Sequence, residues 1–176
     1  MIDINKQDED GLNAFFIAAK HGHGEVMRVL AEHGIDIYNT DRDGNNVLHM
    51  CAGIPERFEI LEMLVKSRYD LNLHNAKGDT AAHHAALKGN LKHLRALVDW
   101  GADVNLFNNH ALTPLYLAVL NNWTDCIDFL LESGARVYNH GDDIQKDRSP
   151  IFLAIRLEQE DTLTSIFDNL EPEESI

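Results

Sequence analysis

The chain has 176 residues, 44% of them hydrophobic and 25% charged, which are ordinary values for a folded domain in water. Its formal net charge of −14, with neutral histidines, repels the phosphates of nucleic acids and of anionic membrane surfaces. No apolar run approaches the ~20 residues that cross a bilayer, and the first residues, MIDINKQDEDG, do not resemble a secretory leader. We therefore expect an intracellular protein, cytoplasmic or nuclear, that neither binds nucleic acid nor inserts into a membrane.

Five stretches along the chain share a pattern that is typical of a helix start. The residues that open them are Asn13, Asn46, Thr80, Thr113 and Ser149, at spacings of 33, 34, 33 and 36 residues. Thr80 and Thr113 are good N-caps, and Pro114 suits the first turn of a helix. Each stretch therefore predicts the first helix of a pair.

A second, amphipathic helix is predicted after the first in the first four units. Its apolar residues recur three and four positions apart: Val26, Val29 and Leu30; Ile60, Leu61 and Leu64; Leu94, Leu97 and Val98; Ile127, Leu130 and Leu131. Gly22, Gly89 and Asn122 fall between the two helices, where a left-handed residue lets the chain reverse. A glycine closes the second helix at positions 34, 101 and 134, whereas Arg68 takes that place in the second unit and predicts a different ending there.

The clearest copies of the first helix read TAAHHA over 80–85 and TPLYLA over 113–118. With a period of about 33 residues, this pattern resembles the ankyrin repeat family, whose core is T-P-L-H-x-A. The resemblance covers nearly the whole chain and implies an all-α solenoid of stacked helix–turn–helix units with outward turn or hairpin loops. The units are expected at 6–38, 39–72, 73–105, 106–138 and 144–170, in one array over 1–170 that is followed by an acidic tail over 171–176.

The histidines and cysteines favour structural roles over chemistry. His49 and His83 occupy a position that aromatic residues fill in the other units, and the resemblance implies that such an imidazole ties neighbouring units through backbone hydrogen bonds. Adjacent residues diverge by about 100° around a helix, so His83 and His84 do not easily share a metal, and His84 is expected to pack between helices. Cys51 and Cys126 lie at apolar positions and are expected to be buried and inert. We expect no enzyme, and no catalytic residue, cofactor or metal.

The resemblance implies a partner surface on the concave face, made of the loop tips and the first helices. The candidate contact residues are Asp10, Leu12, Arg42, Asp43, Lys77, Leu87, Phe107, His110, Leu112 and Leu120. The first two tips are acidic and the later ones carry Lys77, His110 and Lys146, so the partner is expected to be basic toward the first two units, unless these charges are simply solvated. Leu87, Phe107, Leu112 and Leu120 form a candidate apolar patch, unless Phe107 and Leu112 pack between the tips.

The leading prediction is a non-catalytic protein–protein interaction module, monomeric, that binds a protein partner. The alternative is a regulatory or targeting ankyrin segment of a larger enzyme, channel or secreted effector, which the opening MIDIN favours slightly because it resembles GADVN over 101–105.

Two further expectations concern single positions. In animal ankyrin-like proteins an asparagine in the context of Asn72 and Asn105 is a substrate for β-hydroxylation, so the resemblance implies these two as modification sites. In the last unit, Thr162, Thr164 and Ser165 dilute the apolar stripe, which predicts a polar cap at the end of the array.

Overall fold

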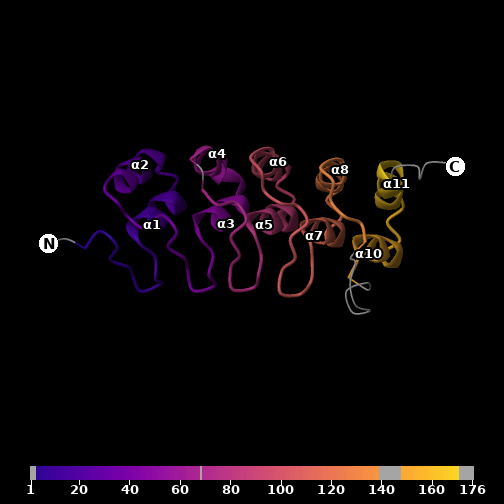
Figure 1. The fold of residues 1–176 in the computed structure, drawn as a ribbon, viewed down its shortest axis with the longest axis horizontal. Helices are drawn as coiled ribbons and strands as arrows, with labels where there is room; N and C mark the ends of the chain where they lie inside the picture. Colours follow the sequence, from indigo (N-terminus) through magenta and orange to yellow (C-terminus); the bar gives the residue numbers. More distant parts are fainter. Residues whose placement is uncertain (1–2, 68, 139–147, 171–176) are drawn as a thin grey trace.

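The fold is a row of helix pairs. The computed structural model describes residues 3–67, 69–138 and 148–170, and this part of the chain contains helices and no strand. Figure 1 shows three layers along the row: the first helices in the middle, the second helices on one side and the extended loops on the other. The predicted all-α solenoid of helix–turn–helix units is thereby confirmed.

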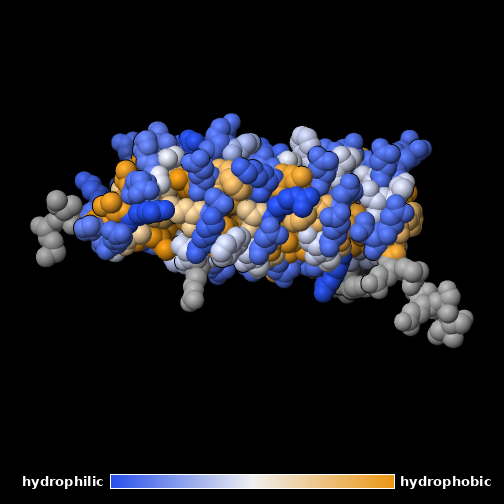
Figure 2. All heavy atoms as spheres, turned by 90° about the horizontal axis from the view of Figure 1, so that it is seen from above, coloured by the Kyte–Doolittle hydropathy of each residue, from blue (hydrophilic) through white to orange (hydrophobic). Residues whose placement is uncertain are grey.

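One pair of helices lies in each of the five expected ranges. The first helices are α1 (Ala14–His21), α3 (Val47–Ala52), α5 (Ala81–Lys88), α7 (Pro114–Leu120) and α10 (Pro150–Arg156). The second helices are α2 (Gly24–Glu32), α4 (Phe58–Lys66), α6 (Leu91–Asp99), α8 (Thr124–Glu132) and α11 (Glu160–Asn169), and a 3-10 turn, η1 (Pro55–Arg57), precedes α4. Viewed from the side of the second helices, much of the surface is hydrophilic, with hydrophobic areas that include both ends of the row (Figure 2).

Helices α1 and α7 begin where the sequence places their N-caps, because a side-chain oxygen satisfies a free backbone N–H group of the first turn. The side chain of Asn13 accepts from the N–H of Phe16, and Oγ1 of Thr113 accepts from the N–H of Tyr116. Arg68 and most of the loop over 136–150 lie outside the described residues, and so does the tail over 171–176.

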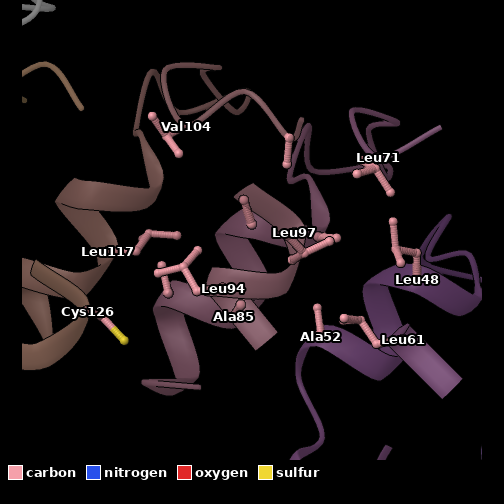
Figure 3. Packing of buried hydrophobic residues seen from close by; sticks show 14 of the residues in the cluster. Leu48, Ala52, Leu61, Leu71, Ala85, Leu94, Leu97, Val104, Leu117 and Cys126 are labelled. Carbon is pink, nitrogen blue, oxygen red and sulfur yellow. The ribbon is translucent and has the colours of Figure 1, made fainter. Parts of the chain in front are cut away.

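The core is one continuous stack rather than five separate cores. Leu48, Ala52 and Leu61 of the second unit lie on one side of α5 and α6, and Leu117 and Cys126 of the fourth unit lie on the other (Figure 3). Each unit therefore buries apolar surface mainly against its neighbours.

Two histidines join consecutive units, as the resemblance implied. The imidazole Nε2 of His49 lies 2.9 Å from the carbonyl oxygen of Asp79, and that of His83 lies 3.0 Å from the carbonyl oxygen of Leu112. Because a carbonyl only accepts, Nε2 carries the proton, and Nδ1 accepts from the backbone N–H at the start of its own helix. Each ring thus fixes the start of one helix and the tip of the next unit.

Burial keeps these rings neutral. It lowers the pKa of His49 from 6.5 to about 4, with a smaller contribution from the nearby charge of His84. Burial also lowers the pKa of His83, His84 and His93. Within the described residues, Nε2 of His93 is buried without a hydrogen-bond partner, so protonation of this nitrogen would leave an unsatisfied N–H donor between α4 and α6.

Each of the first four loop tips is closed by a carboxylate or amide oxygen of its own chain. The residues that supply it are Asp8, Asp41, Asn75 and Asn108, and in each the Oδ1 atom accepts the backbone N–H groups two and four residues later. The amides of Asn75 and Asn108 also donate to Asn45 and Asp79 in the preceding tip, at 2.7 Å each. The tips therefore form a laterally bonded row of fixed shape.

The turn of the third unit is built around a close approach of a tryptophan. Gly89 has φ +68°, and a Cβ atom placed there would lie 2.5 Å from Cδ2 of Trp123. The indole Nε1–H of Trp123 donates to the carbonyl of Leu87 at 3.2 Å, which holds the ring over the glycine. Asn122 and Gly22 also adopt positive φ, as the sequence predicted for these inter-helix turns.

The predicted polar cap at the end of the array is wrong. Thr162 is buried and corresponds in register to Ile60 and Cys126, which are buried between their units and the preceding ones. Thr162 therefore faces the fourth unit, whereas Thr164 and the apolar side chains of Phe152, Ile155 and Phe167 are exposed.

A Gly89→Ala substitution tests the close approach of Trp123. The αL backbone costs a non-glycine residue of order 1 kcal/mol, and displacing the indole adds about 1–3 kcal/mol. Gly134→Ala is the matched control, because Gly134 also has a positive φ but has open space around its Cβ position. Urea unfolding should show a clearly larger loss of stability for Gly89→Ala, and equal losses would contradict the packing account.

A His83→Ala substitution tests the tie between the third and fourth units. Loss of the hydrogen bond to the carbonyl of Leu112 and the cavity that remains should lower the free energy of unfolding by about 2–3 kcal/mol. His74→Ala, at an exposed position, should change it by no more than about 0.5 kcal/mol. If both variants unfold at the same urea concentration, His83 does not hold the stack together.

Stability should fall on acidification because the unfolded state binds more protons than the folded state between the two pKa values of a buried histidine. For His49 this window runs from pH 6.5 down to about pH 4. Protonation of His49 in the unfolded state lowers the free energy of unfolding at pH 5 by about 2 kcal/mol. Replacing His49 by Phe, the residue at the same position in the first unit, should flatten the decline of urea midpoints from pH 7 to pH 5. An unchanged slope in the variant would refute this assignment.

Candidate functional site

A groove of about 300 Å³ lies where the tips of the first two units meet α1 and α3. Its lining residues are Asp10, Leu12, Phe16, Lys20, Asp41, Arg42, Asp43, Met50 and Ile54. Four of the predicted contact residues, Asp10, Leu12, Arg42 and Asp43, lie in this lining.

Arg42 shapes the rim of the groove by joining the two tips. Its guanidinium Nη2 donates to the carbonyl oxygen of Glu9 at 2.5 Å and lies 3.4 Å from a carboxylate oxygen of Asp10. The Asp41 carboxylate, as the closing residue of its tip, is already engaged by backbone N–H groups. The rim is therefore a bonded structure rather than a set of free side chains.

Fewer carboxylates of these tips are free of hydrogen bonds and ion pairs than the sequence indicated. Asp8 and Asp41 close their own tips, and Asp10 pairs with Arg42. Within the described residues, the carboxylates of Glu9 and Asp43 make no hydrogen bond or ion pair. These two are the negative charges that a partner finds unpaired.

The floor of the groove is apolar. Phe16 is buried at the start of α1, and Met50 and Ile54 are partly buried along and after α3. Leu12, expected on the exposed tip, is only 6% exposed because it packs into the core beneath the tip. Its part in a contact is therefore limited to the floor of the groove.

Three lining residues, Phe16, Met50 and Ile54, were not predicted from the sequence as contacts. Phe16 and Met50 were assigned to packing positions of the repeat, and the groove uses the edges of side chains that mostly serve the core. The signal that was available is positional: Phe16 and Lys20 lie four apart on α1, and Met50 and Ile54 lie four apart one position further along in the next unit.

The remaining predicted contacts lie along the third and fourth units. Lys77 and His110 are exposed on the tips, and Leu87, Phe107 and Leu120 are at least 38% exposed. Leu112 is partly buried against the core. The grouping of Leu87, Phe107, Leu112 and Leu120 into one apolar patch stays a prediction. Lys146, expected in the last tip, lies outside the described residues.

The cysteines are poor candidates for chemistry. Burial raises the pKa of Cys51 to about 12 and that of Cys126 to about 11, so both thiols are protonated at neutral pH. In the adjacent pair His83 and His84, His83 bonds to the tip of the fourth unit, while Nε2 of His84 lies 3.2 Å from the amide of Asn75. In the described ranges no group of three or more His, Cys, Asp or Glu side chains is placed to hold a metal ion.

Among the described helices, none combines the length and the apolar character that crossing a bilayer requires.

Asn72 and Asn105 hold the loops between units. Their Oδ1 atoms accept the backbone N–H groups of Asp103 and Arg136 in the following loops, at 2.9 and 2.8 Å. Both side chains therefore have a structural task, and their modification stays a prediction.

Comparison with known proteins finds relatives that are much longer than this chain. It is 29% identical to the E3 ubiquitin-protein ligase KEG of Arabidopsis thaliana over 74% of the chain and 8% of the ligase. It is 28% identical to a transient receptor potential cation channel subfamily A member 1 homolog of Caenorhabditis elegans over 79% of the chain and 12% of the channel. It is 27% identical to the nuclear factor NF-kappa-B p105 subunit of Gallus gallus over 86% of the chain and 16% of that subunit.

A family model for ankyrin repeats in three copies matches residues 1–74 and again 56–141. These matches cover most of the chain, and they agree with the repeat spacing and with the stacked helix pairs. The chain belongs to the ankyrin repeat family.

Proposed function

We propose that the chain is a non-catalytic protein–protein interaction module that holds an extended segment of a partner protein in the groove of the first two units. The observation that carries the proposal is the apolar floor beneath a charged rim, on the face made of tips and first helices. Ankyrin repeats bind protein partners through preformed surfaces, and the groove supplies such a surface here.

The chemistry of the groove selects the partner. The floor of Phe16, Met50 and Ile54 suits an apolar side chain, and the unpaired carboxylates of Glu9 and Asp43 favour Lys or Arg beside it. A volume of about 300 Å³ lies at the lower limit for small-molecule pockets, so it suits one anchoring side chain. The preferred ligand is a peptide segment that places a basic residue next to a large apolar one.

The bonded row of tips limits the cost of binding. Arg42 is tied to the first tip, and the backbone N–H of Ala76 donates to the carbonyl of Asp43 at 3.0 Å. A partner therefore meets a surface whose backbone is already ordered, and little conformational entropy is lost on the side of the module. A long partner then extends toward Lys77, Phe107 and His110, which supply the further contacts.

The relatives support a second reading of the same surface. The ligase, the channel and the p105 subunit each contain the matching segment as a small share of a longer chain. In that reading the module regulates or targets a larger enzyme, channel or secreted effector, and the groove holds a segment of that protein or of its target. The native full-length transcript distinguishes the two readings.

The groove can be tested by selecting peptides from a random library on the wild-type protein. We expect the selected peptides to combine Lys or Arg with a large apolar residue, and Asp43→Lys or Met50→Glu to weaken their binding by about tenfold or more. Asp128→Lys, an exposed charge reversal on α8, is the matched control and should leave binding unchanged.

Loss of the same peptides in Phe107→Ala plus Leu112→Ala, with full binding to Asp43→Lys and Met50→Glu, would move the site to the third and fourth units. Binding that is insensitive to all of these variants would reject this face of the array as the partner surface.

A further inference from the structure

In the last unit, side chains at positions that are buried in the interior units are exposed at the end of the row. Ile155 is the register equivalent of Ala19, Ala52, Ala86 and Val119, all of which are fully buried in the stack, yet Ile155 is 53% exposed. Phe152 is likewise 45% exposed, whereas its equivalents Phe16, His49, His83 and Tyr116 are buried. The C-terminal face therefore has the composition of a surface that contacts a following unit.

The first unit has the opposite half of the same interface. Val26 is 50% exposed, although its register equivalents, Ile60, His93, Cys126 and Thr162, are all buried between units. Val29 is 55% exposed on the same face of α2, where the equivalent Phe129 of α8 is buried. The N-terminal face therefore has the composition of a surface that contacts a preceding unit.

A hydrogen bond also joins each unit to the preceding one, and the two ends of the row hold its donor position and its acceptor position. In each later unit, the residue before the second helix donates to a carbonyl near the end of the preceding first helix: Arg57 to Lys20, Asn90 to Ala52, Trp123 to Leu87 and Gln159 to Val119. His23 holds this donor position in the first unit and is exposed. The equivalent carbonyls at the other end of the array are those of Ile155 and Arg156.

We propose that two copies of the chain associate head to tail, with the C-terminal face of one copy on the N-terminal face of the next. The occupant is a second copy because one chain presents both halves of a contact that it already makes four times internally, between α1 and α3, α3 and α5, α5 and α7, and α7 and α10. In this register the imidazole of His23 lies over the turn that contains Glu158. Such a contact is heterologous, so it permits longer rows as well as pairs.

The association is weak and depends on salt. Separate copies lose translational and rotational freedom that linked units do not lose, and each copy carries a formal charge of −14. We therefore expect a monomer in dilute solution and association as the concentration rises. Added salt screens the repulsion and strengthens the contact.

Analytical ultracentrifugation of the full chain from about 1 μM to about 1 mM tests the proposal. We expect the average mass to rise with concentration, and to rise further at high salt. Val29→Asp and Ile155→Asp should each abolish the rise, since each places a charge on one half of the contact. Trp100→Asp, an exposed apolar position in the middle of the row, should leave it intact.

Mixing the two charge variants gives the decisive readout. Val29→Asp keeps a working C-terminal face and Ile155→Asp keeps a working N-terminal face, so the mixture should form a 1:1 pair and nothing longer. Circular dichroism checks that both remain folded, and Val26→Asp with Phe167→Asp form a second pair of variants. A wild-type chain that stays monomeric throughout overturns the proposal, as does association that Ile155→Asp abolishes and Val29→Asp does not affect, because this indicates a symmetric contact between C-terminal faces.

Discussion

The contact between neighbouring units determines the rest of this structure. A helix pair of about 33 residues cannot bury its apolar face alone, so each unit is stable only where another unit covers it. The fully buried residues of the first helices, such as Ala52 and Ala86, lie at this contact rather than inside a unit. Small side chains at these positions let the helices approach closely, and larger residues such as Leu61 and Leu94 of the second helices fill the remaining space.

The same contact sets the geometry of the functional face. His49 and His83 connect α3 and α5 to the tips of the third and fourth units, and Asn75 and Asn108 connect these two tips to the preceding ones. The position of the third tip is therefore defined relative to two neighbours. The first and second tips, which form the groove, have neither tie, because Phe16 and Asp41 take these positions; Arg42 joins them instead, through the carbonyl of Glu9 and the carboxylate of Asp10.

Sequence reasoning reached the fold because the signals for it are local and repeated. The N-cap at Thr113, the left-handed turn at Gly89 and the histidine tie at His83 each depend on residues at fixed spacing along the chain. The site was only partly predictable, because exposure depends on which neighbour covers a residue. Leu12 was placed on the surface by its position in the tip, yet the turn directs its side chain inward.

The prediction of a polar cap at the end of the array failed at Thr162 for the same reason, because exposure depends on which neighbour covers a residue. Thr162 dilutes an apolar stripe in the sequence, but a periodic pattern does not say whether a position faces the previous unit or the next one. The structure resolves this by register: Thr162 takes the place of Cys126 and faces the fourth unit, so the face that remains open is lined by Ile155 and Phe167. The partner groove and the N-terminal end meet on α1 and its tip, because each internal contact between units joins two first helices. Leu12, in the lining of the groove, is the register equivalent of Leu112, whose carbonyl lies against His83 of the preceding unit. The two surfaces therefore adjoin on the first unit.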